Sequence, residues 1–167
     1  MPLIGVLSDT HGVLPEAYKT FFEGCDEIWH AGDVGDIAVL EKLSGIKPVK
    51  AVYGNIDGQK IRQFTSPYLF FNYGEVKVLL RHIVGRPGSY IPDARKQISI
   101  LKPDLVVCGH SHILLVKYDE KNNLLHVNPG AAGNSGFHKM ITMLRFRIEG
   151  RSISNMEIWE KPRMKTI

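Results

Sequence analysis

The chain contains an apolar run, Leu105 to Cys108, that is followed by Gly109 and then by two histidines, His110 and His112. An uninterrupted apolar run of this length is typical of a buried strand, and the glycine lets the backbone turn tightly where the strand ends. Two imidazoles one residue apart are therefore expected at the end of a strand. Closely spaced histidines alone are more often solvated or capped than metal-bound, so a metal site needs support from other segments.

That support comes from four further segments with the same arrangement, an apolar run that ends in side chains able to bind a metal. They are residues 3–8 followed by Asp9 and His11, 27–30 followed by Asp33, 49–53 followed by Asn55, and 76–80 followed by His82. Ligands in an open α/β sheet gather at the carboxyl ends of its strands. The five segments together therefore predict one metal site.

The order of the apolar segments predicts an α/β fold. Strands at 3–8, 27–30 and 49–53 alternate with helices from Pro15 up to Gly24 and from about Asp36 to Leu43, as in a parallel sheet. These are followed by a hairpin at 68–71 and 76–80, a helix at about 92–101 and the strand from residue 105. We interpret the rest of the chain as a β meander of four strands, at 113–118, 124–127, 141–147 and 152–159. We expect two mixed β-sheets packed face to face, with helices outside.

Length and composition indicate one ordinary globular domain over residues 1–167. The chain is 44% hydrophobic and 23% charged, and no apolar run approaches the length of a membrane span. The first apolar stretch is broken at Asp9 and lacks a preceding basic segment, so a signal peptide is not expected. A cytoplasmic protein without a membrane partner is predicted. Cys25, in a helix-like segment, and Cys108, in a strand, are expected to be reduced and buried.

The net charge of +4 does not predict a nucleic-acid partner, because the basic residues are scattered along the chain. A homo-oligomer is left open by the sequence. A small substrate that binds the predicted metal site is the partner most consistent with these features.

The candidate ligands are two carboxylates, one carboxamide and four imidazoles. This set is too large for one tetrahedral ion with a vacant position and suits two ions that share a bridging carboxylate. Mixed nitrogen and oxygen ligands favour Mn²⁺, with Ni²⁺, Fe²⁺ or Zn²⁺ as alternatives, over Ca²⁺ or Mg²⁺. The seven predicted metal ligands are Asp9, His11, Asp33, Asn55, His82, His110 and His112.

The charge of such a centre predicts its substrate. Two divalent cations and two aspartates leave a charge of about +2, which attracts a phosphate ester anion. A single cationic site with no evident arginine clamp suits a singly charged phosphodiester better than a doubly charged monoester.

The ordered motifs resemble those of the calcineurin-like metallophosphoesterase superfamily. They are Asp9-x-His11, Gly32-Asp33, Gly54-Asn55-x-Asp57, His82, Gly109-His110-x-His112 and the late Asn128-Pro129-Gly130, within residues 3–133. The short chain is similar to the small branch that includes the bacterial phosphodiesterase YfcE and the retromer scaffold subunit. The resemblance implies a four-layer αββα sandwich.

The resemblance also implies roles for the ligands. Asp9, His11, Asp33 and His112 would hold one metal, and the bridging Asp33 with Asn55, His82 and His110 would hold the other. A metal-bridging hydroxide would attack phosphorus in line, with Asp9, Asp33, Asn55 and His82 counted as catalytic. The alternative implied by the same branch is a non-catalytic interaction scaffold that retains the metal pocket.

Two positions depart from the superfamily pattern. Many members carry a histidine after the motif asparagine, whereas this chain has Ile56, which can donate neither a proton nor a hydrogen bond. A preference for good leaving groups such as aryl esters follows. The residues after His82 also differ from the Gly-His usual in the small branch, since Ile83 and Val84 follow here.

Several neighbouring residues have simpler interpretations beside the functional ones. Asp57 is expected to close a turn, and Asn128 to lie in a turn whose backbone supports the His110 and His112 loop. His30 is either a donor that orients a ligand or a buried, satisfied histidine. The remaining expectations are a structural His126, solvated His138 and Lys139, and one of Arg81 and Arg86 as a phosphate-binding residue.

Overall fold

The computed structural model describes residues 1–164, and these contain two five-stranded mixed sheets. In the first sheet β1, β2 and β3 are parallel, whereas β11 and β12 are antiparallel to their neighbours. The strand order is β12 (Ser152–Pro162), β11 (Met140–Glu149), β1 (Leu3–Leu7), β2 (Glu27–His30) and β3 (Val49–Ala51).

The second sheet has a parallel centre of β5, β8 and β10, with an antiparallel strand at each edge. Its order is β4 (Tyr68–Tyr73), β5 (Val76–Arg81), β8 (Leu105–Val107), β10 (Leu124–Pro129) and β9 (Leu114–Asp119). The other elements are helices α1 (Tyr18–Phe22), α2 (Ile37–Ser44), α3 (Gln59–Arg62) and α4 (Pro92–Leu101), and the small hairpin of β6 (Gly85–Arg86) and β7 (Ser89–Tyr90).

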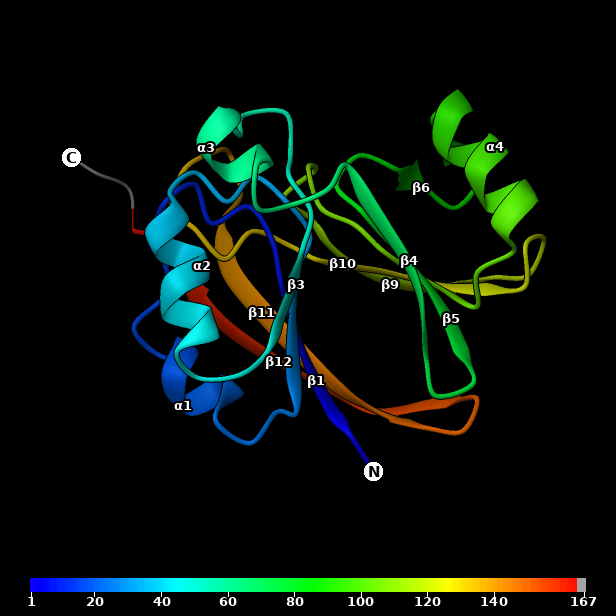
Figure 1. Ribbon diagram of the computed structural model, residues 1–167, viewed down its shortest axis with the longest axis horizontal. Coiled ribbons are helices and arrows are strands. Elements are labelled where there is room, and N and C mark those ends of the chain that lie inside the picture. The colour runs from blue at the N-terminus through cyan, green and yellow to red at the C-terminus, as the bar shows by residue number, and fades with distance from the viewer. Residues whose placement is uncertain (165–167) are drawn as a thin grey trace.

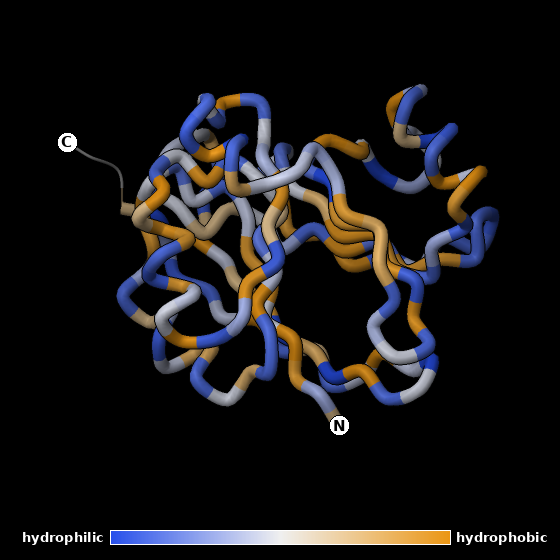
Figure 2. Tube along the Cα trace, viewed as in Figure 1, coloured by the Kyte–Doolittle hydropathy of each residue, from blue (hydrophilic) through white to orange (hydrophobic). Residues whose placement is uncertain are grey.

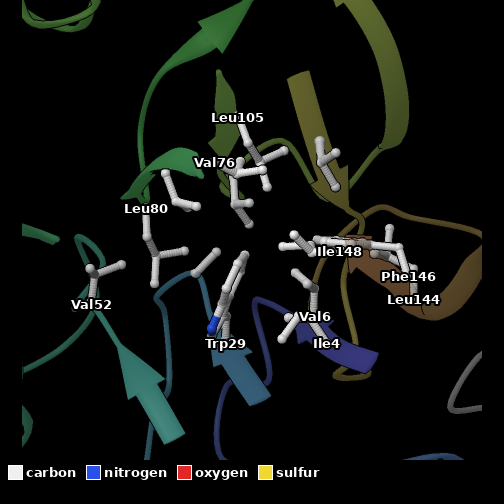
Figure 3. Packing of buried hydrophobic residues seen from close by; sticks show 14 residues of the cluster. Ile4, Val6, Trp29, Val52, Val76, Leu80, Leu105, Leu144, Phe146 and Ile148 are labelled. Atoms are coloured by element: carbon white, nitrogen blue, oxygen red, sulfur yellow. The ribbon is translucent and has the colours of Figure 1, made fainter. Parts of the chain in front are cut away.

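Three hydrophobic clusters define four layers. The largest lies between the two sheets, where Trp29 of β2 shares a buried cluster with Leu80 of β5 and Phe146 of β11 (Figure 3). A second cluster packs α1 and α2 on the outer face of the first sheet, and a third packs α4 on the second sheet (Figure 1). Figure 2 shows the hydrophobic residues concentrated along the strands. The predicted αββα sandwich of two mixed sheets is confirmed.

The predicted β meander is wrong. Strands β9 and β10 pair in the second sheet, and β10 lies parallel to β8, whereas β11 and β12 belong to the first sheet. The chain therefore crosses from one sheet to the other between Pro129 and Met140. The turn signals predicted the two hairpins, but they could not show that the hairpins lie in different sheets.

The other element predictions hold with shifted bounds. Helix α1 ends at Phe22, so Cys25 lies in the loop after the helix and not within it, and α3 was not predicted. Both cysteines are free and buried, as expected. Within residues 1–164, no helix combines the length and apolar character that a membrane crossing requires.

Candidate metal centre

The predicted ligands follow the carboxyl ends of five strands. Asp9 and His11 follow β1, and the other ligands follow β2, β3, β5 and β8 in turn. The backbone there is unusual, because five ligands have a positive φ, which non-glycine residues adopt rarely and which recurs at functional sites. These φ angles are 54° at Asp9, 45° at His11, 54° at Asp33, 74° at His110 and 61° at His112.

Two glycines allow these loops to approach one another closely. A Cβ atom at Gly54 would lie 2.0 Å from Asp33 Oδ1, and one at Gly109 would lie 2.0 Å from Ser8 Oγ and 2.6 Å from Asp9 Oδ2. All three distances are far below van der Waals contact. The loops therefore need glycine at these two positions.

One group of ligands is formed by Asp9, His11 and His112, which each offer an atom within 4.8 Å of the others. His112 Nε2 lies 3.2 Å from Asp9 Oδ1, and His11 Nε2 lies 4.0 Å from the same oxygen. The ring nitrogens and the carboxylate oxygen thus face a common point.

A second group is formed by Asp33, His82 and His110, again within 4.8 Å of one another. His82 Nε2 lies 3.2 Å from Asp33 Oδ2, and Asn55 Oδ1 lies 3.1 Å from His110 Nδ1. Asp33 Oδ2 is also 3.5 Å from His11 Nε2 of the first group. Asp33 therefore lies between the groups, and all seven predicted ligands come together.

Three buried atoms at the centre of these groups have no hydrogen-bond partner, namely Asp9 Oδ1, His11 Nε2 and His82 Nε2. Buried polar atoms without partners are costly and rare, and bound cations can satisfy both carboxylate oxygens and ring nitrogens. His82 Nδ1 lies 2.7 Å from the carbonyl oxygen of Ala31, which only accepts, so Nδ1 carries a proton, and the neutral His82 ring presents the lone pair of Nε2 to a cation. The residues present fit divalent cations.

Both carboxylates are held in the form that binds cations. Burial acts to raise the pKa of Asp9, but the neighbouring His112 and His82 rings and the Ser8 hydroxyl hold it below its ordinary value. For Asp33, burial is likewise outweighed, mainly by His82, and the pKa is lowered. Asp9 and Asp33 are therefore ionised at neutral pH.

Comparison with known proteins identifies the family. The sequence-family model that describes the calcineurin-like phosphoesterase superfamily domain matches residues 3–151. The chain belongs to the calcineurin-like phosphoesterase superfamily. A probable metallophosphoesterase from Methanothermobacter thermautotrophicus is 31% identical over 134 residues, which span 77% of this chain and 76% of that protein. A phosphodiesterase from Methanocaldococcus jannaschii is 25% identical over 76% of this chain and 82% of its own length.

Solved structures with low sequence identity share the fold of this chain. Vps29 from Entamoeba histolytica, in complex with Zn²⁺, has a TM-score of 0.76 at 16% identity and covers 97% of this chain and 99% of its own. Vps29 from Chaetomium thermophilum has a TM-score of 0.75 at 16% identity, covering 98% of this chain and 100% of its own. These structures support the αββα architecture.

Asp57 fixes the loops that carry two of the candidate ligands. Its carboxylate accepts hydrogen bonds from the backbone N–H groups of Val34, Gly35 and Gly54 at 2.9–3.0 Å. The first two groups follow Asp33, and the third precedes Asn55. The predicted turn-closing role of Asp57 is confirmed, and the same bonds hold the loops after β2 and β3 together.

His30 is a buried histidine whose two nitrogens are both satisfied. The Thr10 hydroxyl donates to the carbonyl of Val34, so His30 Nε2 donates to Thr10 Oγ1 at 2.9 Å, while Gly32 N–H donates to His30 Nδ1 at 3.1 Å. Burial lowers the pKa of His30 to about 4, and the ring is neutral. These bonds connect His30 to Thr10 and Gly32, in the loops that carry ligands after β1 and β2. None of them involves a ligand side chain.

His138 reaches the site, contrary to the sequence expectation of a solvated side chain. Its Nε2 donates to the carbonyl of Gly133 at 2.8 Å, and its Nδ1 lies 3.2 Å from Nδ1 of His112. The glycine-rich loop before His138 was the only sequence signal for this approach. Asn128 supports the same region through its side chain, which donates to the Gly109 carbonyl and to Ser111 Oγ, each at 3.0 Å.

The remaining candidates, His126, Arg81 and Arg86, are not part of the two ligand groups. His126 is buried beside Cys108, with 3.5 Å between Nε2 and Sγ, which is consistent with a structural role. Arg86 is exposed on β6, whereas Arg81 is partly buried next to His82.

Proposed function

We propose that the protein is a dinuclear metal-dependent phosphoesterase that acts on phosphodiesters. The observation that carries this proposal is the position of Asp33 Oδ2, 3.2 Å from His82 Nε2 and 3.5 Å from His11 Nε2, between two groups of ligand atoms. Membership of the calcineurin-like phosphoesterase superfamily supports a metal-dependent phosphoesterase. The relative named a phosphodiesterase supports the preference for diesters.

The two ligand groups support a distribution of the residues between two ions. Asp9, His11 and His112 would hold one ion, His82, His110 and Asn55 would hold the other, and Asp33 would bridge them. When bound, two divalent cations lower the pKa of water and so make hydroxide available for in-line attack on phosphorus. Mn²⁺ is the proposed native metal, and the Zn²⁺ complex of the Entamoeba histolytica structure supports a divalent transition metal.

The residues around the ions select and hold the substrate through charge. With both aspartates ionised, two divalent cations leave about +2 at the site, which favours binding of a phosphate ester anion. Ile56 is 47% exposed next to Asn55, and its backbone N–H donates to Asp33 Oδ1 at 3.1 Å, but its side chain supplies no proton to a leaving group. Esters with stable leaving groups are therefore the preferred substrates.

The alternative is an interaction scaffold, which the similarity to Vps29 structures favours at the level of fold. The complete set of seven ligands and the three unpartnered buried atoms favour the enzyme. The cytoplasmic location and the single domain over residues 1–167 stay predictions, and the oligomeric state stays open.

The direct test is hydrolysis of bis(p-nitrophenyl) phosphate and of p-nitrophenyl phosphate by metal-stripped protein, with and without Mn²⁺. We expect turnover only with metal, and a higher kcat/KM for the diester. Asp33→Asn is the matched variant and is expected to lose activity by at least about a hundredfold, because the bridging charge is removed. Folded wild-type protein that turns over neither ester with any of Mn²⁺, Ni²⁺, Fe²⁺ and Zn²⁺ would favour the scaffold.

A further inference from the structure

A pocket of about 320 Å³ opens beside the second group of ligands. Two candidate ligands, Asn55 and His82, form part of its wall, so the pocket adjoins the proposed site of phosphate binding. No carboxylate lines it, and its lining includes two arginines and two tyrosines, namely Tyr53, Arg62, Tyr68 and Arg81.

Arg62 is held in place by contacts that leave its charge available. Its Nε donates to the backbone carbonyl of Asp57 at 2.6 Å, and its guanidinium lies over the ring of Tyr53, 4.3 Å from the ring centre. Asp57 is the residue that fixes the loops of Asp33 and Asn55. The position of Arg62 is therefore coupled to the same loop framework as the ligands, while its two terminal nitrogens make no hydrogen bond within residues 1–164.

Arg81 is the last residue of β5 and immediately precedes the ligand His82. Its Nη1 donates to Oε1 of Gln97 in α4 at 3.0 Å, a neutral acceptor that orients the guanidinium without neutralising it. In the part of the chain that the structure describes, the Lys and Arg ion pairs involve Lys50 and Arg145, so neither pocket arginine has a carboxylate within 4.0 Å.

We infer that this pocket is a subsite for a second phosphate group, and that the substrates are phosphodiesters which carry one. Two arginines without carboxylate partners form charge-assisted, bidentate hydrogen bonds with phosphate oxygens. The inference rests on the proposed phosphodiesterase function and names its substrate class. It also revises the sequence expectation, in which the absence of an evident arginine clamp favoured a substrate with a single charge.

The test compares two substrates that release the same leaving group, thymidine 5′-(p-nitrophenyl phosphate) and its 3′-phosphorylated form. With Mn²⁺-loaded wild-type protein, the added phosphate is expected to lower KM by about tenfold or more. In the double variant Arg62→Gln and Arg81→Gln this advantage, measured as the ratio of the two KM values within the variant, is expected to fall to about twofold or less. Replacing both residues by Lys is expected to preserve part of the advantage, since the positive charges remain.

Arg86→Gln is the matched control, because Arg86 is exposed on β6 and does not line the pocket, and it should keep the full advantage. The Kd values of thymidine 3′,5′-bisphosphate and thymidine 5′-monophosphate give the same comparison without turnover. Equal KM values for the two substrates in wild type, or an advantage that survives in the Gln double variant, would overturn the subsite. Loss of turnover on both substrates with tighter bisphosphate binding retained would instead reject the enzymatic function and leave the subsite standing.

Discussion

At the scale of single residues, His138 fixes the orientation of a candidate ligand. Its Nε2 donates to the Gly133 carbonyl, so in the neutral ring Nδ1 is an acceptor and receives the proton on His112 Nδ1, 3.2 Å away. The lone pair of His112 Nε2 is then directed toward Asp9 Oδ1, 3.2 Å distant. This is the tautomer that binds a metal.

His138→Ala is therefore expected to weaken metal binding by about 10–100-fold while the protein stays folded. His138→Gln retains a side-chain hydrogen-bond acceptor and should lose less metal affinity than His138→Ala. Competition with a chromophoric chelator measures the affinity of the metal-free protein for Zn²⁺. If His138→Ala bound the metal as tightly as wild type, the proposed orientation of His112 would be wrong.

Ile56 limits the range of leaving groups. The histidine found in many members at this position is expected to assist departure of a poor leaving group, so Ile56→His should raise kcat/KM for alkyl phosphodiesters by about tenfold and change aryl ester hydrolysis less. Steady-state rates on matched methyl and p-nitrophenyl esters provide the measurement, with Ile56→Gln as the control for polarity alone. No gain on the alkyl ester would contradict this explanation.

The clustering of the candidate ligands was predictable from the sequence, but their backbone conformation was not. A recurring apolar run before Asp, Asn or His marks a strand end, and this pattern suffices to select residues such as Asp33 and His82. The positive φ of Asp33 and the approach of His138 depend on loops that meet only in the folded chain. A sequence read locally carries little information about either feature.

At the scale of elements, α2 begins with a side-chain cap. Asp36 precedes the helix and accepts a hydrogen bond from the backbone N–H of Ala38 at 2.9 Å, so Asp36→Ala should lower the free energy of unfolding by about 1 kcal/mol. Glu41→Ala, on an exposed position of the same helix, should change it by less than about 0.5 kcal/mol. Urea unfolding of metal-free protein measures both, and equal effects would show that the cap contributes nothing.

The start and end of α2 were predictable because Asp36 and Gly45 are local signals. The placement of β11 was not, because its partner β1 is the first strand of the chain and lies more than 130 residues away in sequence. The ten residues between β10 and β11 permit either a local turn or a crossing to the other sheet. The chain crosses to the other sheet because this route allows both faces of each sheet to be buried.

At the scale of the whole molecule, buried neutral histidines make the fold sensitive to acid. Burial lowers the pKa of His126 to about 4, below the ordinary value near 6.5, as it does for His30. Between about pH 6.5 and 4 these two histidines are protonated in the unfolded chain but neutral in the folded protein. Their contribution to stability is therefore complete above about pH 6.5 and is lost as the pH falls toward 4.

Between pH 7.5 and 4.5, metal-free wild type is expected to lose about 2–3 kcal/mol more stability than His126→Leu, which cannot take up this proton. Urea unfolding at a series of pH values measures the difference. The His126 account would be rejected if both proteins lost stability in parallel over that range.

The central claim is that two divalent cations act together at Asp9, His11, Asp33, Asn55, His82, His110 and His112. The most direct measurement is a titration of metal-free protein with Mn²⁺, in which bound metal and hydrolysis of bis(p-nitrophenyl) phosphate are followed together. We predict that activity rises until two ions are bound per chain. Full activity with one bound ion, or two bound ions without hydrolysis, would contradict the account.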